Sequence, residues 1–239
     1  IVAESGVAFL AVLPFDRQLA AYSAQQFVDE VLRQRVLMKE LVIGYDHGFG
    51  RGREGNVDTL RALGRERGFL VHVIPPVSVS DGGSPRPASS TLIRRAVAGG
   101  DLETAARELG RRYSVTGTVR PGDSRGRLLG FPTINLGSPH PRKLLPPEGV
   151  YAVLVHTPRG PFGGMMNLGT RPTFGDTTVT LEAHLLDADV ELYGATVKME
   201  FVARLRDVRR FPSPDALVAQ LRTDESHARR ALTRVAAGH

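Results

Sequence analysis

Residues 125–136, RGRLLGFPTINL, end in a rigid step that carries two oxygen-bearing side chains. Pro132 fixes its own φ and pushes Phe131 toward an extended conformation, so this step is not predicted to be helical. In an extended chain Thr133 and Asn135 point to the same side. Their hydroxyl and amide oxygens suit a Mg²⁺ ion that keeps water and substrate phosphates as its other ligands. The spacing predicts a magnesium–phosphate site, with a proline turn on the surface as the alternative.

The stretch before this step, GTVRPGDSRGRLLG at 117–130, is rich in glycine and arginine. Glycines let backbone N–H groups approach an anion, and arginines pair with phosphate oxygens. The predicted phosphate contacts are Gly117, Arg120, Arg125, Gly126, Arg127 and Gly130. An arginine-rich surface hairpin has the same composition, so the spacing alone leaves both interpretations open.

A second constellation is TVTLEAHLLD at 178–187. Strict alternation predicts a strand with Leu181 and other apolar residues on one face, and Thr180, Glu182 and His184 on the other. The Glu182 carboxylate could act as a general base toward a substrate hydroxyl. A glutamate that merely faces solvent on an antiparallel sheet is the commoner alternative.

Two segments of the first half could bind a nucleotide. GYDHGFGRGREGN at 44–56 contains a glycine-rich loop, although it does not match the dinucleotide fingerprint. In SSTLIRRA at 89–96, Ser90 and Thr91 lie at a predicted helix start and Arg94 lies one turn on. A helix N-terminus attracts phosphate, but an ordinary Ser/Thr cap explains the same residues.

The first half must position these groups with alternating strands and helices. We predict strands at 7–15, 41–45 and 69–77, and helices at about 57–67, 91–98 and 101–109, the first of which ends at Gly68. Ser23 and Gln26 form a predicted capping box that opens a further helix to about Val36. This alternation indicates βαβ units and a parallel sheet, which is a Rossmann-like α/β domain.

From about residue 111 the pattern changes to short strands separated by Gly/Pro turns. They are predicted at 112–119, 150–156, 162–168, 178–186 and 196–204, which is typical of a small antiparallel barrel or sandwich. A C-terminal helix follows, with Ser213 as N-cap and Pro214 at its first position. We therefore expect two domains, 1–110 and 111–239.

Composition narrows the classes of function. The 239 residues contain no cysteine, which excludes disulfides, thiol catalysis and cysteine-ligated metals. No apolar run approaches the roughly 18 residues that a transmembrane helix needs, and the first residues show no secretory signal, so a cytoplasmic protein is expected. The net charge of +6 allows nucleic-acid binding, but the arginines are dispersed and there is no Trp for stacking.

Several motifs follow one another along the chain in this order: GYDHGFGRGREG, SSTLIRRA, GRLLGFPTINL, LLPPEGVYAV, NLGTRPTF, LEAHLLD, LYG and LRDVRRF. In this order they resemble the bacterial bifunctional riboflavin kinase/FMN adenylyltransferases, also called FAD synthetases, over essentially the whole chain. The resemblance implies a riboflavin kinase that transfers phosphate from MgATP to the riboflavin 5′-hydroxyl and gives FMN. It also implies an adenylyltransferase that converts FMN to FAD with ATP. Small molecules are the expected partners, without nucleic acid or membrane, and the chain is expected to be a monomer.

The resemblance assigns roles to individual residues. It makes Thr133 and Asn135 ligands of the Mg²⁺ of MgATP, although Ile134 stands where the family usually has Ala, and it makes Glu182 the catalytic base. Residues implied to lie near the flavin are Arg171, Thr173, Leu192, Tyr193 and Gly194. Residues implied to bind nucleotide in the adenylyltransferase domain are Asp46, Gly50, Ser90, Thr91 and Arg94.

One family element has no counterpart in this sequence. The family carries Gly-x-Phe-Asp-Gly-Val-His-x-Gly-His, whose histidines assist adenylyl transfer, whereas His47 and His72 lie in other contexts. We therefore expect the chain to lack the first part of the adenylyltransferase domain and to adenylylate FMN poorly. Two alternatives remain: a non-catalytic flavin-binding protein and a basic barrel that binds nucleic acid.

Overall fold

The computed structural model describes residues 5–80, 85–122, 125–137, 140, 142–173 and 176–237. The chain divides into two compact units, Ile1–Ser78 and Val79–His239. The boundary predicted at 110/111 from the change of pattern stays a prediction. By packing, the two helices before residue 110 lie in the second unit.

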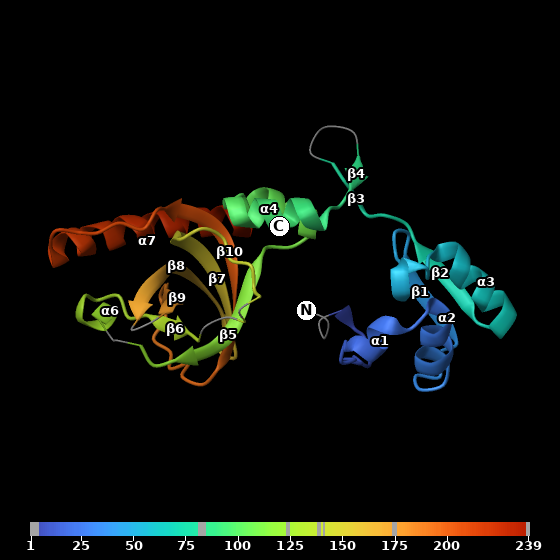
Figure 1. Ribbon diagram of the computed structural model, residues 1–239. Coiled ribbons are helices and arrows are strands. Elements are labelled where there is room, and N and C mark those ends of the chain that lie inside the picture. Colours follow the sequence, from blue (N-terminus) through green and yellow to red (C-terminus); the bar gives the residue numbers. More distant parts are fainter. Residues whose placement is uncertain are drawn as a thin grey trace. The chain divides into compact units, whose positions relative to one another are not determined.

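The first unit is built on two parallel strands, as the α/β pattern predicted. Its elements are α1 (Arg17–Ala21), α2 (Ala24–Gln26), η2 (Phe27–Arg33), β1 (Glu40–Gly44), η3 (Arg51–Arg53), α3 (Val57–Arg67) and β2 (Leu70–Ile74). β1 pairs with β2 in parallel, and α3 packs beside β2 (Figure 1). The core of the unit consists of Val28, Ile43, Leu60, Leu63 and Phe69.

The helix ends of this unit follow the predicted local signals. The Ser23 hydroxyl accepts the Gln26 N–H while the Gln26 side chain accepts the Ser23 N–H, so the capping box is confirmed. α3 ends at Gly68, whose left-handed conformation suits a residue without a side chain.

The strand predicted at 7–15 is wrong. These residues form no strand, and the side chains of Phe9 and Val12 are 95% and 82% exposed. A strand needs a partner for its backbone groups, and among the described residues of this unit the sheet contains β1 and β2 alone.

The second unit begins with short elements that lead into a barrel. β3 (Ser78–Val79) pairs with β4 (Arg86–Pro87), and α4 (Ser90–Gly99) and α5 (Leu102–Leu109) follow. Six antiparallel strands then close a barrel in the order β10-β5-β6-β9-β8-β7, which confirms the predicted antiparallel barrel (Figure 1). They are β5 (Ser114–Arg120), β6 (Ile134–Leu136), β7 (Gly149–Thr157), β8 (Gly160–Thr173), β9 (Asp176–Leu185) and β10 (Thr196–Arg206).

The barrel interior is a packed apolar core. Its largest buried side chains include Tyr151, Phe201, Met166, Leu168, Leu181 and Met199. α7 (Pro214–Ala237) lies along the outside of β7, β8 and β10 and packs Ala228 against Met165. The Ser213 hydroxyl accepts the Ala216 N–H, as its predicted capping role requires.

Candidate active site

A row of polar side chains crosses four strands of the barrel wall. In register, Arg120 of β5 stands opposite Asn135 of β6, Asn135 opposite Glu182 of β9, and Glu182 opposite Asn167 of β8. Their strand neighbours, such as Leu136 and Leu181, are buried in the barrel core. Because side chains alternate along a strand, the polar row points outward. The predicted metal ligand Asn135 and the predicted base Glu182 are therefore direct neighbours.

The Pro132–Thr133 step is anchored to β9 by a side chain. The ladder between β6 and β9 extends to the pair Ile134–Ala183, and Pro132 has no N–H to donate. The Nδ1 atom of His184 lies 2.8 Å from the Pro132 carbonyl oxygen. The His184 ring also meets the Phe131 ring edge-on, with 5.2 Å between centroids.

Glycines of the arginine-rich segment make room for the site. The sequence predicted a loop here, and the structure has one helical turn, α6 (Arg125–Leu128). A Cβ on Gly126 would lie 2.3 Å from the Phe131 carbonyl oxygen, and one on Gly122 would lie 2.1 Å from the Asn135 amide nitrogen. Both distances are far below van der Waals contact, so these positions hold the site residues close to the loop backbone.

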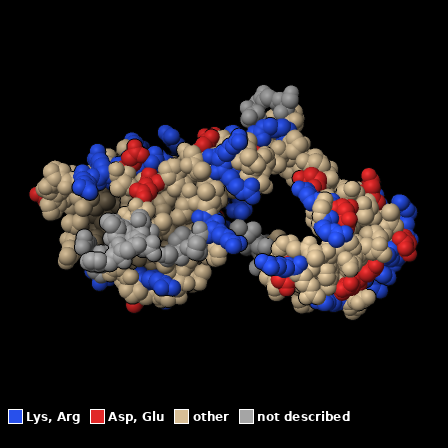
Figure 2. Space-filling model, in the orientation of Figure 1, with Lys and Arg blue, Asp and Glu red and all other residues tan. Residues whose placement is uncertain are grey.

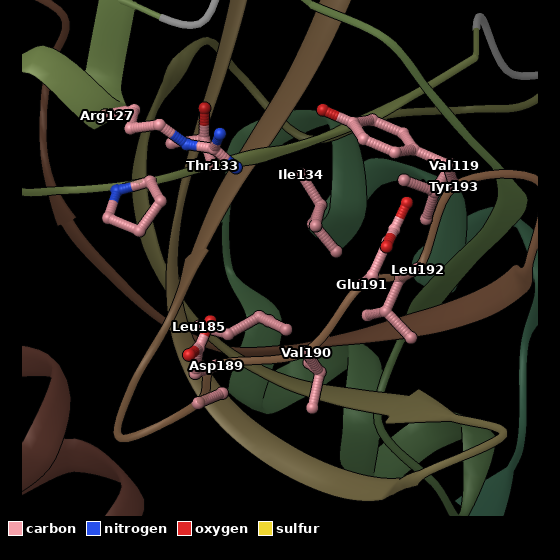
Figure 3. A pocket seen from close by; sticks show the side chains of 12 residues that line it. Val119, Arg127, Thr133, Ile134, Leu185, Asp189, Val190, Glu191, Leu192 and Tyr193 are labelled. Carbon is pink, nitrogen blue, oxygen red and sulfur yellow. The ribbon is translucent and has the colours of Figure 1, made fainter.

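A cavity of about 420 Å³ lies beside the Pro132–Thr133 step. In Figure 3, Arg127 and Thr133 project from one side of it, and Glu191 and Tyr193 from the other. Apolar residues from β5, β6 and the turn after β9 form much of the remaining wall: Val119, Ile134, Leu185, Val190 and Leu192. The charged side chains of the lining are Arg127, Asp189 and Glu191, so only the Arg127 side of the cavity suits an anionic group.

A second cavity, of about 370 Å³, lies on the outward face between the barrel and the start of α7. It contains Glu182, Asn167 and His184. Its walls are mostly apolar or aromatic and include Val150, Met165, Val208, Phe211, Leu217 and Leu221. Thr133 lines both cavities, so it marks their junction.

An ion pair holds one edge of the second cavity. Arg206, which lines it, donates to both carboxylate oxygens of Asp224 on α7, and Asp224 is 1% exposed. Arg206 and Arg209 both lie over the Phe211 ring, at 5.6 and 4.9 Å from its centroid. These contacts fix the segment between β10 and α7 that supplies the aromatic wall.

A further ion pair supports the turn that forms the wall of the first cavity. Asp187 follows β9 with a left-handed φ of 55°, and Arg229 of α7 donates to both of its carboxylate oxygens. This guanidinium lowers the pKa of Asp187 below its ordinary value. The turn that leads to Glu191 and Tyr193 is thereby tied to α7.

Of the other residues predicted for the kinase phosphate site, Gly126 and Arg127 line a cavity, whereas Gly117, Arg120, Gly130 and the predicted metal ligand Asn135 line neither of the two. Gly117 and Arg120 are on β5, Arg125 and Gly126 are on α6, and Gly130 follows α6. Leu192 and Tyr193 line the cavity that contains Arg127 rather than the one that contains Glu182, and Gly194 follows them. Arg171 and Thr173 end β8, but their side chains lie outside the described part of the chain.

The predicted nucleotide residues of the first half fall in two places. Asp46 lines an open depression with His47 and Arg53, and Gly50 lies in the same loop, packed against the backbone of Ala24. Ser90, Thr91 and Arg94 are exposed on the first turns of α4, where the Ser89 hydroxyl caps the Leu92 N–H. Their ligand roles stay predictions.

Charged side chains of both signs lie on the surface of both units (Figure 2). On the face in Figure 2, Lys and Arg side chains are interspersed with Asp and Glu over both units and form no single basic block. Among the described residues, no three His, Asp or Glu side chains gather in a way that could hold a metal ion by themselves. Among the same residues, no helix is both long and apolar enough to cross a membrane.

The family models and the similar proteins point to the same enzyme family. Residues 109–232 match the riboflavin kinase (flavokinase) family model, and residues 1–86 match the FAD synthetase model. The chain is 38% identical to the bifunctional riboflavin kinase/FMN adenylyltransferase of Escherichia coli K12 over 95% of its own length and 71% of that protein. The chain belongs to this family.

Other similar proteins match the chain over a similar share of its length. The Bacillus subtilis bifunctional riboflavin kinase/FMN adenylyltransferase is 32% identical, again over 95% of the chain and 71% of the relative. A crystal structure described as a macrolide-efflux protein from Streptococcus pneumoniae superposes with a TM-score of 0.78 at 32% identity, covering 95% of this chain and 72% of that one. That description concerns the other protein, whereas both family models and the curated relatives name flavin enzymes.

Three residues near the candidate active site were not predicted as site residues from the sequence of this riboflavin kinase/FMN adenylyltransferase homologue. Asn167, Gly122 and His184 each contact or flank a predicted ligand. Asn167 lies in the NLGTRPTF motif and His184 shares a strand face with Glu182, so both carried a signal. Gly122 lies in the glycine-rich stretch 117–130, but its closeness to Asn135 follows only from where the Asn135 side chain lies.

Proposed function

We propose that this chain phosphorylates riboflavin at its 5′-hydroxyl with ATP, giving FMN and ADP. The observation that carries the proposal is that Thr133 lines both cavities while Glu182 lines only the second. One substrate in each cavity would place the two reacting ends at the Thr133 junction. Such positioning is most of what phosphoryl transfer requires of a protein.

We assign the nucleotide to the first cavity and the flavin to the second. Arg127 supplies positive charge for phosphates in the first cavity, whose apolar wall fits an adenine ring. The second cavity offers Phe211 and aliphatic side chains for an isoalloxazine ring and the Glu182 carboxylate for a hydroxyl. With this assignment Leu192 and Tyr193 contact the nucleotide, whereas family resemblance places them near the flavin.

In the reaction Glu182 accepts the proton of the riboflavin 5′-hydroxyl. The hydroxyl oxygen forms a bond to the γ-phosphorus, and the bond from that phosphorus to the bridging oxygen of ADP breaks. Arg127 of α6 lines the first cavity together with Thr133, and we propose that it offsets the charge of the transferred group. Arg120 belongs to the outward row that contains Glu182, but it lines neither cavity.

Magnesium is the metal that this donor set fits. Thr133 and Asn135 offer two neutral oxygens, too few for a site made of protein alone but suitable for an ion held mainly by water and phosphates. When bound, Mg²⁺ neutralises developing phosphate charge. We propose Thr133 and Asn135 as its protein ligands.

The proposal is tested by incubating the chain with riboflavin, ATP and Mg²⁺ and separating the flavins by chromatography. We expect FMN to form with one ADP per FMN. Riboflavin binding without ATP consumption would instead support a non-catalytic flavin-binding protein. Salt-sensitive DNA binding without FMN formation would support a basic nucleic-acid-binding barrel.

Adenylylation of FMN to FAD is a second candidate, because residues 1–86 match the FAD synthetase model. The same chromatography measures it. We further propose a cytoplasmic monomer, which size-exclusion chromatography and cell fractionation would check.

A further inference from the structure

His184 holds the backbone of the Pro132–Thr133 step. A carbonyl oxygen only accepts hydrogen bonds, so the 2.8 Å contact with Pro132 requires a proton on Nδ1 of His184. This bond takes the place of a ladder bond, since the register ends at Ile134–Ala183. The imidazole thus fastens the last part of the chain before β6 to β9.

The residues around Pro132 are also fixed, but from another side. The Phe131 ring packs edge-on to His184, and the Phe131 N–H donates to the Gly126 carbonyl oxygen at 2.8 Å. Asn135, by contrast, is fixed by its place in the ladder opposite Glu182. Thr133 lies between these two anchors in the chain.

We propose that His184 is a positioning residue that sets the distance between the Thr133 hydroxyl and the Asn135 amide, and so shapes the binding of the magnesium nucleotide. The inference rests on the proposed function, in which these two oxygens face MgATP. His184 acts on the nucleotide through the backbone, although its ring lines the other cavity.

The geometry of the bond suggests a matched set of variants. The Asn side-chain N–H lies as many bonds from Cα as the His Nδ1–H does, whereas the Gln amide lies one bond farther. His184→Asn should therefore keep the bond, and His184→Gln and His184→Ala should lose it. His156→Ala, on β7 away from both cavities, is the control for loss of a strand histidine.

The measurements are kcat and KM for each substrate, together with Mg-ADP binding by calorimetry. Loss of one positioning bond should raise the KM for MgATP and the Mg-ADP dissociation constant by about 10-fold in His184→Ala and His184→Gln. The KM for riboflavin, whose cavity the His184 ring also lines, should rise less than the KM for MgATP, and His184→Asn should keep the KM for MgATP within about 3-fold of the unchanged chain. Circular dichroism checks that each variant folds; if His184→Ala does not, the Asn and Gln variants decide.

Two outcomes overturn the inference. If His184→Gln has the same KM for MgATP as His184→Asn, His184 has no positioning role. If the KM for riboflavin rises instead of the KM for MgATP, His184 acts on the flavin. A chain that makes no FMN would refute the proposed function instead. In that case the Mg-ADP dissociation constant, measured by calorimetry, still tests whether His184 affects the Thr133–Asn135 site.

Discussion

Asn135 on β6 and Glu182 on β9 stand directly opposite each other in the barrel wall. Side chains opposed in this way on antiparallel strands have Cβ atoms roughly 5 Å apart. The proposed metal ligand and the proposed proton acceptor are therefore brought together by strand register. A shift of one residue would turn one of them into the barrel core, so the register that buries Leu136 and Leu181 also assembles the site.

Glu182→Gln removes the proton acceptor but keeps the size of the side chain. We expect FMN formation to fall by about 10²- to 10⁴-fold, because a positioned general base contributes that much. Riboflavin and Mg-ADP binding, measured by fluorescence quenching and calorimetry, should change little. Glu103→Gln, an exposed change on α5, is the control. Undiminished turnover in Glu182→Gln would refute the base role.

Asn135 and Asn167 flank Glu182 on opposite sides of the same row, which makes them a matched pair. Asn135→Ala should raise the Mg²⁺ concentration for half-maximal FMN formation by about 10-fold, because one of two protein oxygens is lost. Asn167→Ala should leave this requirement unchanged and raise the KM for riboflavin. A magnesium titration of both variants at saturating ATP separates the two roles, and equal magnesium curves would contradict the assignment.

Gly122 is predicted to matter because of the Asn135 side chain. A Cβ at position 122 would lie 2.1 Å from the Asn135 amide nitrogen, so Gly122→Ala must push that amide away. The amide is the end of a side chain and can move, so we expect less than about 1 kcal/mol of lost stability but a higher magnesium requirement. Gly99→Ala on α4, where a Cβ would touch nothing, is the control. The idea fails if both alanines leave the magnesium titration unaltered.

Much of the fold could be predicted because its signals are local. The capping box at Ser23, the left-handed end of α3 at Gly68 and the alternation around Glu182 all involve neighbours in sequence. The strand predicted at 7–15 failed because an apolar run does not reveal whether a partner strand is available. Pairing is a long-range property that no single segment contains.

The candidate site also contains some residues that local sequence predicts and others that depend on long-range contacts. Thr133, Asn135 and Glu182 were predicted from residue type, spacing and family resemblance, and the structure brings Asn135 and Glu182 side by side. The role of Gly122 and the bond from His184 to Pro132 depend on contacts between segments 13 and 52 residues apart. The two cavities and their junction at Thr133 likewise arise only when the barrel closes.

A last prediction concerns the segment that leads into α4. The Glu108 side chain is fully buried and accepts hydrogen bonds from Arg86 and from the Ser89 N–H. The Arg86 guanidinium, helped by that N–H, holds the pKa of Glu108 below its ordinary value. A carboxylate with a lowered pKa stabilises the fold above the unfolded-state pKa of about 4.3, and this contribution disappears as the pH falls through the folded-state value.

Glu108→Gln should therefore lower the urea midpoint clearly at neutral pH. The difference from the unchanged chain should shrink as the pH falls from about 4.3 through the lowered folded-state pKa of Glu108, because below that pKa both chains carry a neutral side chain. Urea unfolding followed by circular dichroism over this pH range measures it. Glu103→Gln on the exposed face of the same helix should show a small difference throughout. A gap for Glu108→Gln that stays constant into acid would mean that packing, rather than the charge of Glu108, supports this segment.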